Sequence, residues 1–453
     1  MIQLDTKRNT LMQKVYHYQL QDVAEPNLYR EIFPYVELPK IPFTHRESPM
    51  DPPEDIWITD STFRDGQQAR EPYTAEQVVR LYDLLHELGG PKGIIRQTEF
   101  FLYSKLDRDC AYKCMERGYS FPEVTGWIRA TEKDFDLAKS MEVKECGILV
   151  SASDYHIFHK LGKTRKEAMR DYLKIIESAI AAGIRPRCHM EDITRADFYG
   201  FVVPFAHALH QLMEDTGVPI KIRTCDTMGY GVSYPGADLP RSVPGIMYGL
   251  RYYAGFSSAL LEWHGHNDFY KAVTNAASAW LYGASSVNCT LLGIGERTGN
   301  TPVEGMVAEY AQLRGTLDGM NPQVITEIAD YYRTELKYDI PPQTPLVGRD
   351  FNATQAGIHA DGLMKDQEIY NAFDTKLILN VPPKVIINAK SGLAGVAYWL
   401  NNHPELINLP APVDKKNPVV LKIKEWVDEQ FAAGRVAAIS DAEMAWAYKK
   451  FSN

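Results

Sequence analysis

The feature that most constrains the fold of this chain is a regular alternation of short apolar and amphipathic segments between residues 55 and 313. Each apolar segment has the length of a buried strand, and each is followed by a stretch with the apolar spacing of a helix. Eight such strand–helix units fill about 260 residues. The alternation predicts a parallel sheet, and eight units of this length favour a closed (β/α)₈ TIM barrel over an open sheet.

The predicted barrel, residues 55–320, is flanked by two segments of different character. Residues 1–54 are Pro-rich and lack strand or helix periodicity, and their frequent Tyr and Phe favour an arm lying over a domain or a partner subunit. Residues 321–453 begin with the helical pattern PQVITEIADYYRTEL and predict a small, mainly helical appended domain. Barrel helices are predicted at residues 75–88, 107–117, 132–140, 165–182, 197–214, 243–252, 271–282 and 302–313.

Composition and charge exclude several classes of function. The net charge is −9 and no long Lys/Arg run is present, which argues against nucleic-acid binding. The first residues lack the apolar core of a signal peptide, and no window approaches 18 consecutive apolar residues, so we expect no membrane span. Six cysteines without a C-x-x-C pair favour a reducing compartment, and we expect a cytoplasmic protein.

A metal site is predicted at the carboxyl ends of the barrel strands, where barrel enzymes carry their chemistry. Asp65 follows the first predicted strand, and His264 and His266 end the seventh, two apart and so on one face of a strand. Only the eighth strand separates the first predicted strand from the seventh, so the ends of these two strands lie roughly 10 Å apart. One carboxylate and two imidazoles form a recurrent site for a divalent ion with open positions. Two unrelated surface histidines are the alternative when the HGH pattern is considered alone.

The other strand ends bring further polar side chains to the predicted barrel mouth. A divalent ion there can chelate a 2-oxo acid and polarise its keto carbon. Arg64 could stabilise the alkoxide that forms when a carbon nucleophile attacks, and a salt bridge to Glu99 or Glu191 is its alternative role. His189 either lines the pocket or packs beside it. The mouth residues are Arg64, Gln68, Glu99, Arg187, His189, Glu191, Asp192, Asp226, Thr227, Glu296, Arg297 and Asn300.

Four ordered motifs resemble a known enzyme family. TDSTFRDGQQ, HGHND, GASSVNCTLLGIGERTGN and QAGIHADGLMKDQEIY together are similar to the aldol-type acyl-CoA synthases of the DRE-TIM metallolyase superfamily. These include 2-isopropylmalate synthase, homocitrate synthase and Re-type citrate synthase. The resemblance runs from about residue 57 to residue 373. It implies condensation of acetyl-CoA with a 2-oxo acid, followed by hydrolysis of the thioester.

The resemblance also implies roles for individual residues. Asp65, His264 and His266 resemble the metal ligands, with Asn300 nearby and bound directly or through water. Mn²⁺ is the expected ion, with Mg²⁺ or Co²⁺ as alternatives. The residues expected to be catalytic are Arg64, Glu191, His359 and Tyr370. The residues expected to bind substrate are Gln68, Glu99, Trp127, Arg187, His189 and Thr227.

The appended domain supplies two of these residues. His359 in GIHADG and Tyr370 match a histidine and a tyrosine of the family's C-terminal subdomain. His359 is the expected base toward the acetyl-CoA methyl group, with Glu191 adjacent, although which of His359, Glu191 and Tyr370 takes the proton stays open. In this family the subdomain reaches over the partner's barrel as a lid, so a homodimer with exchanged C-terminal subdomains is implied.

The expected 2-oxo acid follows from features in which this sequence differs from other synthases of the family. Trp127 stands where homocitrate synthases usually carry a histidine, and its bulk favours oxaloacetate over the longer 2-oxoglutarate. The tail is too short for the regulatory domain of isopropylmalate synthases. The Pro-rich arm and the chain length resemble the Re-type citrate synthases, so we expect citrate formation. Homocitrate synthase is the runner-up, followed by a 2-isopropylmalate synthase-like enzyme.

Two other classes of function are weighed against a synthase. Lyases of the HMG-CoA lyase type break the carbon–carbon bond, and they lack the GIHADG subdomain that this chain has. A non-catalytic metabolite-binding barrel would be expected to lose Arg64 or a metal ligand, and none is lost. The motif GIGERTGN is not G-x-G-x-x-G, and its place after the eighth strand suits a phosphate or pantetheine contact.

Overall fold

The computed structural model describes residues 2–6, 10–13 and 17–452. The chain divides into two compact units, Met1–Asn321 and Pro322–Asn453. The first unit holds the N-terminal arm and a closed barrel, and the second is mainly helical. Among the described residues, no helix combines the length and apolar character needed to cross a membrane.

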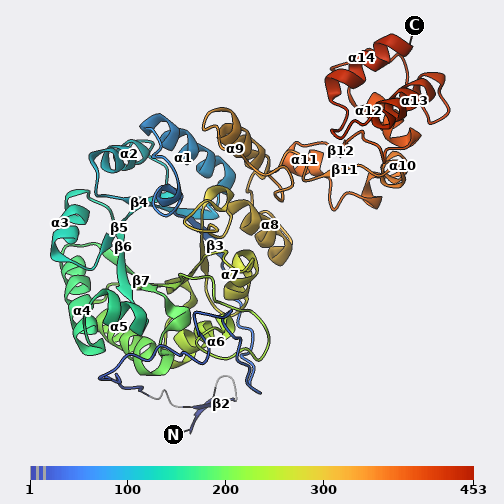
Figure 1. Ribbon diagram of the computed structural model, residues 1–453. Helices are drawn as coiled ribbons and strands as arrows, with labels where there is room; N and C mark the ends of the chain where they lie inside the picture. Colours follow the sequence, from blue (N-terminus) through green and yellow to red (C-terminus); the bar gives the residue numbers. More distant parts are fainter. Residues whose placement is uncertain (1, 7–9, 14–16, 453) are drawn as a thin grey trace. The chain divides into compact units, whose positions relative to one another are not determined.

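Eight parallel strands close into a barrel in the first unit, which confirms the predicted TIM barrel (Figure 1). The strands are β3 (Trp57–Asp60), β4 (Ile95–Phe101), β5 (Glu123–Arg129), β6 (Glu145–Ser151), β7 (Arg185–Glu191), β8 (Lys221–Asp226), β9 (Leu261–Gly265) and β10 (Ser286–Cys289). Their order follows the chain, and β10 closes the barrel by pairing with both β9 and β3. The strands that carry the predicted metal ligands, β3 and β9, are therefore separated by β10 alone.

The helices surround the barrel, and their ends follow local capping signals (Figure 1). They are α1 (Ala75–Gly89), α2 (Lys105–Met115), α3 (Glu132–Ser140), α4 (Arg165–Ala181), α5 (Val203–Thr216), α6 (Val243–Tyr248), α7 (Ala272–Leu281) and α8 (Val303–Arg314). Capping boxes begin α1 at Thr74, α2 at Ser104 and α4 at Thr164. Helix α5 begins later than predicted because Phe198–Val202 forms a wider π-type turn that Asp197 caps.

The N-terminal arm contains one element that the sequence did not predict and otherwise lies over its own barrel. Strands β1 (Ile2–Asp5) and β2 (Thr10–Gln13) pair as an antiparallel hairpin. Farther along, the Asn27 amide donates to Asp154 at 2.7 Å, and Arg165 donates to the Gln21 carbonyl at 3.0 Å. Arg241 donates to the Pro39 carbonyl at 3.1 Å. The irregular part of the arm is thus held by the loops that follow β6 and β8.

The second unit has a hydrophobic core of its own. Its elements are α9 (Gln323–Thr334), β11 (Ala353–Thr354), α10 (Gly357–Lys365), α11 (Thr375–Leu379), β12 (Lys384–Val385), α12 (Leu393–Asn402), α13 (Pro418–Ala432) and α14 (Asp441–Phe451). Val396 and Trp399 of α12 pack with Ile423 and Val427 of α13 and Met444 of α14, all buried. This separate core explains why the unit is compact by itself.

Candidate active site

Asp65, His264 and His266 converge at the carboxyl end of the barrel strands. Asp65 lies in the turn after β3, His264 on β9, and His266 just beyond β9, where it bridges to Asn300. The Nε2 atoms of His264 and His266 lie 3.2 and 3.7 Å from Asp65 Oδ2. All three side chains are buried, and their ligand atoms lie within 4.8 Å of one another. The predicted cluster is therefore assembled by the fold.

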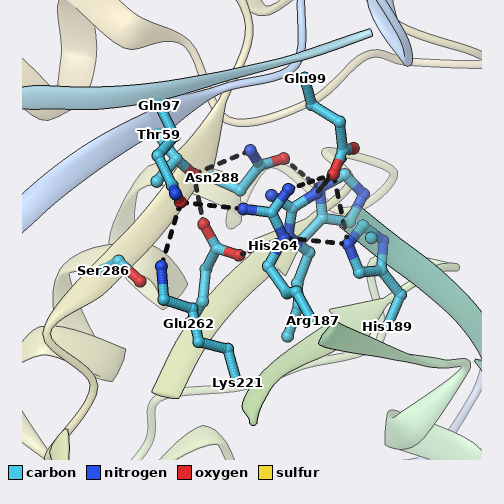
Figure 2. Close-up of polar contacts among 12 residues, drawn as sticks. Thr59, Gln97, Glu99, Arg187, His189, Lys221, Glu262, His264, Ser286 and Asn288 are labelled. Atoms are coloured by element: carbon cyan, nitrogen blue, oxygen red, sulfur yellow. Dashed lines mark hydrogen bonds and ion pairs between the residues drawn. The ribbon is translucent and has the colours of Figure 1, made fainter. Parts of the chain in front are cut away.

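The orientation of His264 is fixed by Asn288 on β10 (Figure 2). His264 Nδ1 lies 2.8 Å from Asn288 Oδ1, an acceptor, so Nδ1 carries the proton and Nε2 presents its lone pair toward Asp65. The Asn288 amide in turn donates to Thr59 at 3.0 Å, and the Thr59 hydroxyl donates to Glu262. Such outer partners orient the imidazole ligands of metals in proteins.

The chemistry of this cluster fits a divalent cation. His266 Nδ1 and Asn300 Oδ1 are buried and have no hydrogen-bond partner among the described residues. Burial lowers the pKa of His266 to about 4, so its imidazole is neutral and able to coordinate near pH 7. Burial raises the pKa of Asp65, but the charge of Arg64 is the first of the causes that outweigh it and hold that pKa well below its usual value. A carboxylate and two imidazoles form a donor set for a divalent ion.

Arg64 lies beside the cluster and is paired with Glu99, as the alternative in the sequence analysis anticipated. Its Nε donates to Glu99 Oε1 at 2.8 Å, and its Nη1 lies 3.6 Å from Asp65 Oδ1. Burial raises the pKa of Glu99, but Arg223 and the other surrounding cations outweigh it and keep this pKa well below its usual value. Glu99 therefore stays ionised and holds the Arg64 guanidinium at the barrel mouth.

Trp127 and His189 form a pair above Glu99. Trp127 Nε1 donates to His189 Nδ1 at 3.2 Å, and Arg187 Nε donates to His189 Nε2 at 3.3 Å. His189 Nε2 also lies 3.3 Å from Glu99 Oε2. Burial, followed by the nearby Arg223, lowers the pKa of His189 well below its usual value. The Arg64 guanidinium lies 5.5 Å from the Trp127 ring centroid. His189 thus joins Trp127 to the charged residues of the barrel interior.

Arg187 lies inside the barrel and not at the end of its strand. It is the third residue of β7, is fully buried, and donates to Glu99 Oε2 at 2.5 Å and to Glu145 Oε1 at 2.9 Å (Figure 2). Arg223 of β8 and Glu262 of β9 belong to the same buried network, and the sequence analysis missed both. Charged residues at alternate positions of IKIRTCD and RPRCHME were the available signal, because alternate strand residues face the barrel interior.

Glu191, Thr227 and Gln68 have separate surroundings at the mouth. The Glu191 carboxylate lies 2.8 Å from His156 Nδ1 and accepts from Lys160 Nζ at 2.9 Å. Burial raises the pKa of Glu191, but the contacts with His156 and Lys160 outweigh it and lower the pKa to about 2. The Thr227 hydroxyl accepts from the Asp192 amide at 2.8 Å, and Gln68 is exposed in the turn after Asp65. The sequence analysis did not find His156 or Lys160.

His359 and Tyr370 belong to the second unit, where they pack against each other. His359 lies on α10, and Tyr370 follows the short turn after that helix. Their ring centroids are 4.3 Å apart. Tyr370 is 43% exposed, and Ile358, which precedes His359 in the chain, is 72% exposed, so both side chains are open to a ligand or another surface.

Comparison with known proteins identifies the family. Residues 55–331 match the HMGL-like family, and this match covers the barrel with its metal cluster. The chain belongs to the HMGL-like family, as the four motifs predicted. A solved structure of the Bacillus subtilis HMG-CoA lyase has the same fold, with a TM-score of 0.51, 18% identity, and coverage of 64% of this chain and 97% of that one.

Relatives over nearly the full length are synthases. The chain is 56% identical to a citrate (Re)-synthase of Clostridium kluyveri, over 95% of this chain and 94% of that protein. It is 53% identical to a citrate (Re)-synthase of Syntrophus aciditrophicus, over 97% of this chain and 70% of that protein. A 2-phosphinomethylmalate synthase of Streptomyces hygroscopicus is 35% identical, over 94% of this chain and 96% of that protein.

Proposed function

We propose that the protein is a Re-type citrate synthase that condenses acetyl-CoA with oxaloacetate and hydrolyses the thioester to citrate and CoA. The observation that carries this proposal is the identity of 56% and 53% to two citrate (Re)-synthases over 95% and 97% of the chain. The Homocitrate synthase AksA of Methanopyrus kandleri is 26% identical over 78% of the chain, so the runner-up function has weaker support.

Asp65, His264 and His266 would hold a divalent ion, with Asn300 as a further ligand, directly or through water. We propose Mn²⁺ first and Mg²⁺ or Co²⁺ as alternatives. When bound, the ion supplies Lewis-acid polarisation of the keto group of the 2-oxo acid. Arg64, held at the mouth by Glu99 at 2.8 Å, is positioned to stabilise the oxygen that gains charge when the acetyl carbon adds.

We propose that Trp127 limits the site to a short 2-oxo acid. Trp127 occupies the mouth with its ring edge against Phe101 and its Nε1 bound to His189. This packing fixes the indole, and its bulk shortens the space for the distal end of the substrate. A single methylene is worth about 1–3 kcal/mol in such a pocket, so the indole favours oxaloacetate over 2-oxoglutarate.

His359 is our proposal for the base that removes the acetyl-CoA methyl proton, with Tyr370 beside its ring. An imidazole suits proton removal near neutral pH. Glu191 is a weaker candidate, because His156 and Lys160 lower its pKa to about 2 and a carboxylate so stabilised is a poor base. Glu191 would instead hold the side chains of His156 and Lys160 at the mouth. Because His359 lies in the second unit, we propose a homodimer in which this unit contributes His359 to the active site of the partner's barrel.

The state of the cysteine thiols supports a proposal for the cellular compartment of the enzyme. All six cysteines are free and buried. Burial raises the pKa of the Cys110 thiol to about 11 and those of the other five farther, so all six resist oxidation. Unpaired cysteines in this number are typical of a reducing environment. We therefore propose the cytoplasm as the location of the enzyme.

The test is release of free thiol from acetyl-CoA in the presence of Mn²⁺, with oxaloacetate, 2-oxoglutarate, 2-oxoisovalerate and pyruvate compared. We expect oxaloacetate to give the highest kcat/KM. A preference for 2-oxoglutarate would overturn the substrate assignment and favour a homocitrate synthase. Trp127→His is the matched variant, and it is expected to shift the preference toward 2-oxoglutarate by about 10-fold or more.

The stereochemical part of the proposal has its own test. Citrate made from isotope-labelled acetyl-CoA is cleaved with a citrate lyase that removes the pro-S arm. A Re-type enzyme places the acetyl carbons in the pro-R arm, so the label is expected in the oxaloacetate fragment. Label recovered in the acetate fragment would show attack on the opposite face.

A further inference from the structure

A cavity of about 250 Å³ lies at the amino-terminal ends of the barrel strands, the end opposite to the metal cluster. Its lining residues stand at or near the first positions of β3 to β9. Trp57, Phe121, Pro219 and Leu260 form its apolar wall. The charged lining residues are Arg96, Glu123, Glu145, Arg185 and Lys221. None of these residues belongs to the site proposed above.

The two carboxylates of the cavity are already paired with cations, and the buried Glu145 Oε2 has an ion pair but no hydrogen bond among the described residues. Glu123 accepts from Gln97 at 2.8 Å and from Arg185 Nη2 at 2.7 Å. Glu145 accepts from Arg187 Nη1 at 2.9 Å, and its other oxygen lies 2.9 Å from Lys221 Nζ. The lining therefore has three cations, Arg96, Arg185 and Lys221, for two carboxylates. One of these carboxylates, Glu145, also accepts a hydrogen bond from Arg187 of the barrel interior. The cavity has a surplus of positive charge within a protein of net charge −9.

Arg96 carries this surplus. It forms no ion pair or hydrogen bond with any described residue, and its guanidinium stacks 4.1 Å from the centroid of the Trp57 ring. Its Nε is buried without a hydrogen-bond partner, and so is the Nε of Arg185, which lies 3.6 Å from Glu145 Oε2. Unbonded guanidinium donors are costly in a partly buried site, and a carboxylate is the ligand that satisfies two of them at once.

We propose that this cavity binds a small organic anion with two or more carboxylates, and that the anion acts as an effector of the enzyme. Arg96 on β4 would bind one carboxylate through its fork of donors. Arg185 and Lys221 on β7 and β8 would bind a second, and the apolar wall would cover the carbon chain between them. The volume suits a ligand of four to six carbon atoms, at roughly 20–30 Å³ for each heavy atom.

A chain of hydrogen bonds and ion pairs connects this cavity to the opposite end of the barrel, and Figure 2 draws its part from Lys221 through Gln97 and Arg187 to Glu99. Lys221 Nζ and Arg187 Nη1 both donate to the side-chain oxygen Oε1 of Gln97, at 3.2 and 3.0 Å. Arg187 is bound to Glu99, and Glu99 is bound to Arg64 at the mouth. An anion that draws Lys221 away from Glu145 changes the partners of Arg187, and this is the physical link from the cavity to the site.

The experiment measures binding of succinate and of tricarballylate to the full-length protein by calorimetry, at constant ionic strength, with succinamide as the uncharged probe. Both anions can also enter the substrate site, so binding is measured in Arg64→Ala as well. Arg96→Gln removes the proposed anchor, and Arg96→Lys keeps the charge without the fork. The exposed Arg170 on α4 supplies the control variant Arg170→Gln. Thermal unfolding and Mn²⁺ binding verify that each variant is folded.

We expect one of the two anions to bind wild type and Arg170→Gln with equal affinity, to remain bound to Arg64→Ala, and to bind Arg96→Gln at least tenfold more weakly, with Arg96→Lys between. Succinamide is expected not to bind. At saturation the anion is expected to change kcat/KM for oxaloacetate about fivefold or more in wild type and not in Arg96→Gln. Unchanged affinity in a folded Arg96→Gln, or no binding of either anion, overturns the site. Binding without a change in kcat/KM overturns its role as an effector site.

Discussion

At the scale of single residues, the geometry of the candidate metal site, Asp65, His264 and His266, depends on a side chain outside the proposed ligand set. Asn288 lies 2.8 Å from His264 Nδ1 and thereby determines which imidazole nitrogen faces Asp65. The hydroxyls of Ser61 and Thr59 hold Asn288 at 2.8 and 3.0 Å. The ligand is thus oriented by a partner on the neighbouring strand, which is the common arrangement around protein-bound metals.

Replacement of Asn288 by Ala is expected to weaken Mn²⁺ binding by about 10–100-fold, because His264 loses the acceptor that fixes its tautomer. Calorimetry with the purified protein measures this change. Asn275→Ala is the matched control, since Asn275 is also buried and hydrogen-bonded but lies on α7 and bonds to Gly231 and Ser233. Equal losses in the two variants would indicate general destabilisation and contradict an orienting role.

The ion pairs of Glu191 predict an acid dependence of stability. Its pKa is lowered from 4.5 to about 2 in the folded protein, so its stabilisation is fully present above about pH 4.5. That stabilisation is lost as pH falls from about 4.5 toward 2, because the unfolded chain takes up the proton first. The difference in unfolding midpoint between wild type and Glu191→Gln is expected to be constant at pH 5–8 and to shrink below pH 4.5.

Urea titrations across this pH range measure the difference, and Glu177→Gln, an exposed glutamate on α4, is the control. The control is expected to differ little from wild type at every pH. A wild-type advantage over Glu191→Gln that grows on acidification would contradict the sign of the shift.

At the scale of elements, the loop after β10 is built around a glycine that no other residue can replace. Gly299 has φ +88°, and a Cβ at this position would lie 2.2 Å from the carbonyl oxygen of Gly293. The next residue, Asn300, donates to Asp65 Oδ2 at 2.7 Å. The loop therefore transmits any displacement at Gly299 to the metal cluster.

Gly299→Ala and Gly315→Ala together separate two effects of an added methyl group, which are backbone strain at a positive φ and a steric clash of the Cβ atom. Gly315 also has a positive φ, +68°, but a Cβ there would meet nothing within 4 Å. We expect Gly315→Ala to cost about 1–2 kcal/mol of unfolding free energy from backbone strain alone. Gly299→Ala is expected to cost a further 1–3 kcal/mol, approximately, from the clash and to weaken Mn²⁺ binding. Urea unfolding and calorimetry measure both, and equal stability losses would contradict the proposed clash.

At the scale of the whole molecule, the metal cluster and the proposed base lie in separate units. Asp65, His264 and His266 belong to Met1–Asn321, and His359 and Tyr370 belong to Pro322–Asn453. Each unit has a core of its own, so each is expected to fold independently. With His359 as the proposed base, the reaction is expected to require both units, whereas metal binding is expected to require only the first.

A fragment of residues 1–321 is expected to fold, to bind Mn²⁺ with the affinity of the full chain, and to release no thiol from acetyl-CoA. Circular dichroism, calorimetry and the thiol assay test these three statements. His359→Ala in the full chain is the matched variant, and it is expected to retain Mn²⁺ binding and lose at least 100-fold in kcat. Turnover by the fragment would contradict the assignment of the base to the second unit.

The barrel could be predicted from the sequence because its signals are local. Strand-length apolar runs alternate with helical spacing, and α3 begins and ends at the predicted residues 132 and 140. The start of α5 was misplaced because the π-type turn before it has the same apolar spacing as a helix. The hairpin of β1 and β2 was missed because its strands are only four residues long.

The sequence by itself determined the order of the barrel strands and the residue types at their carboxyl ends. From these alone Asp65, His264 and His266 could be placed together, because adjacent parallel strands present their ends at one edge. Only the tertiary structure decided that Asn288 orients His264, that Glu99 holds Arg64, and that Arg187 is buried among carboxylates. These contacts join residues far apart in the chain. Which residues meet depends on how the barrel closes and on the register of its strands, and neither can be predicted from a local sequence pattern.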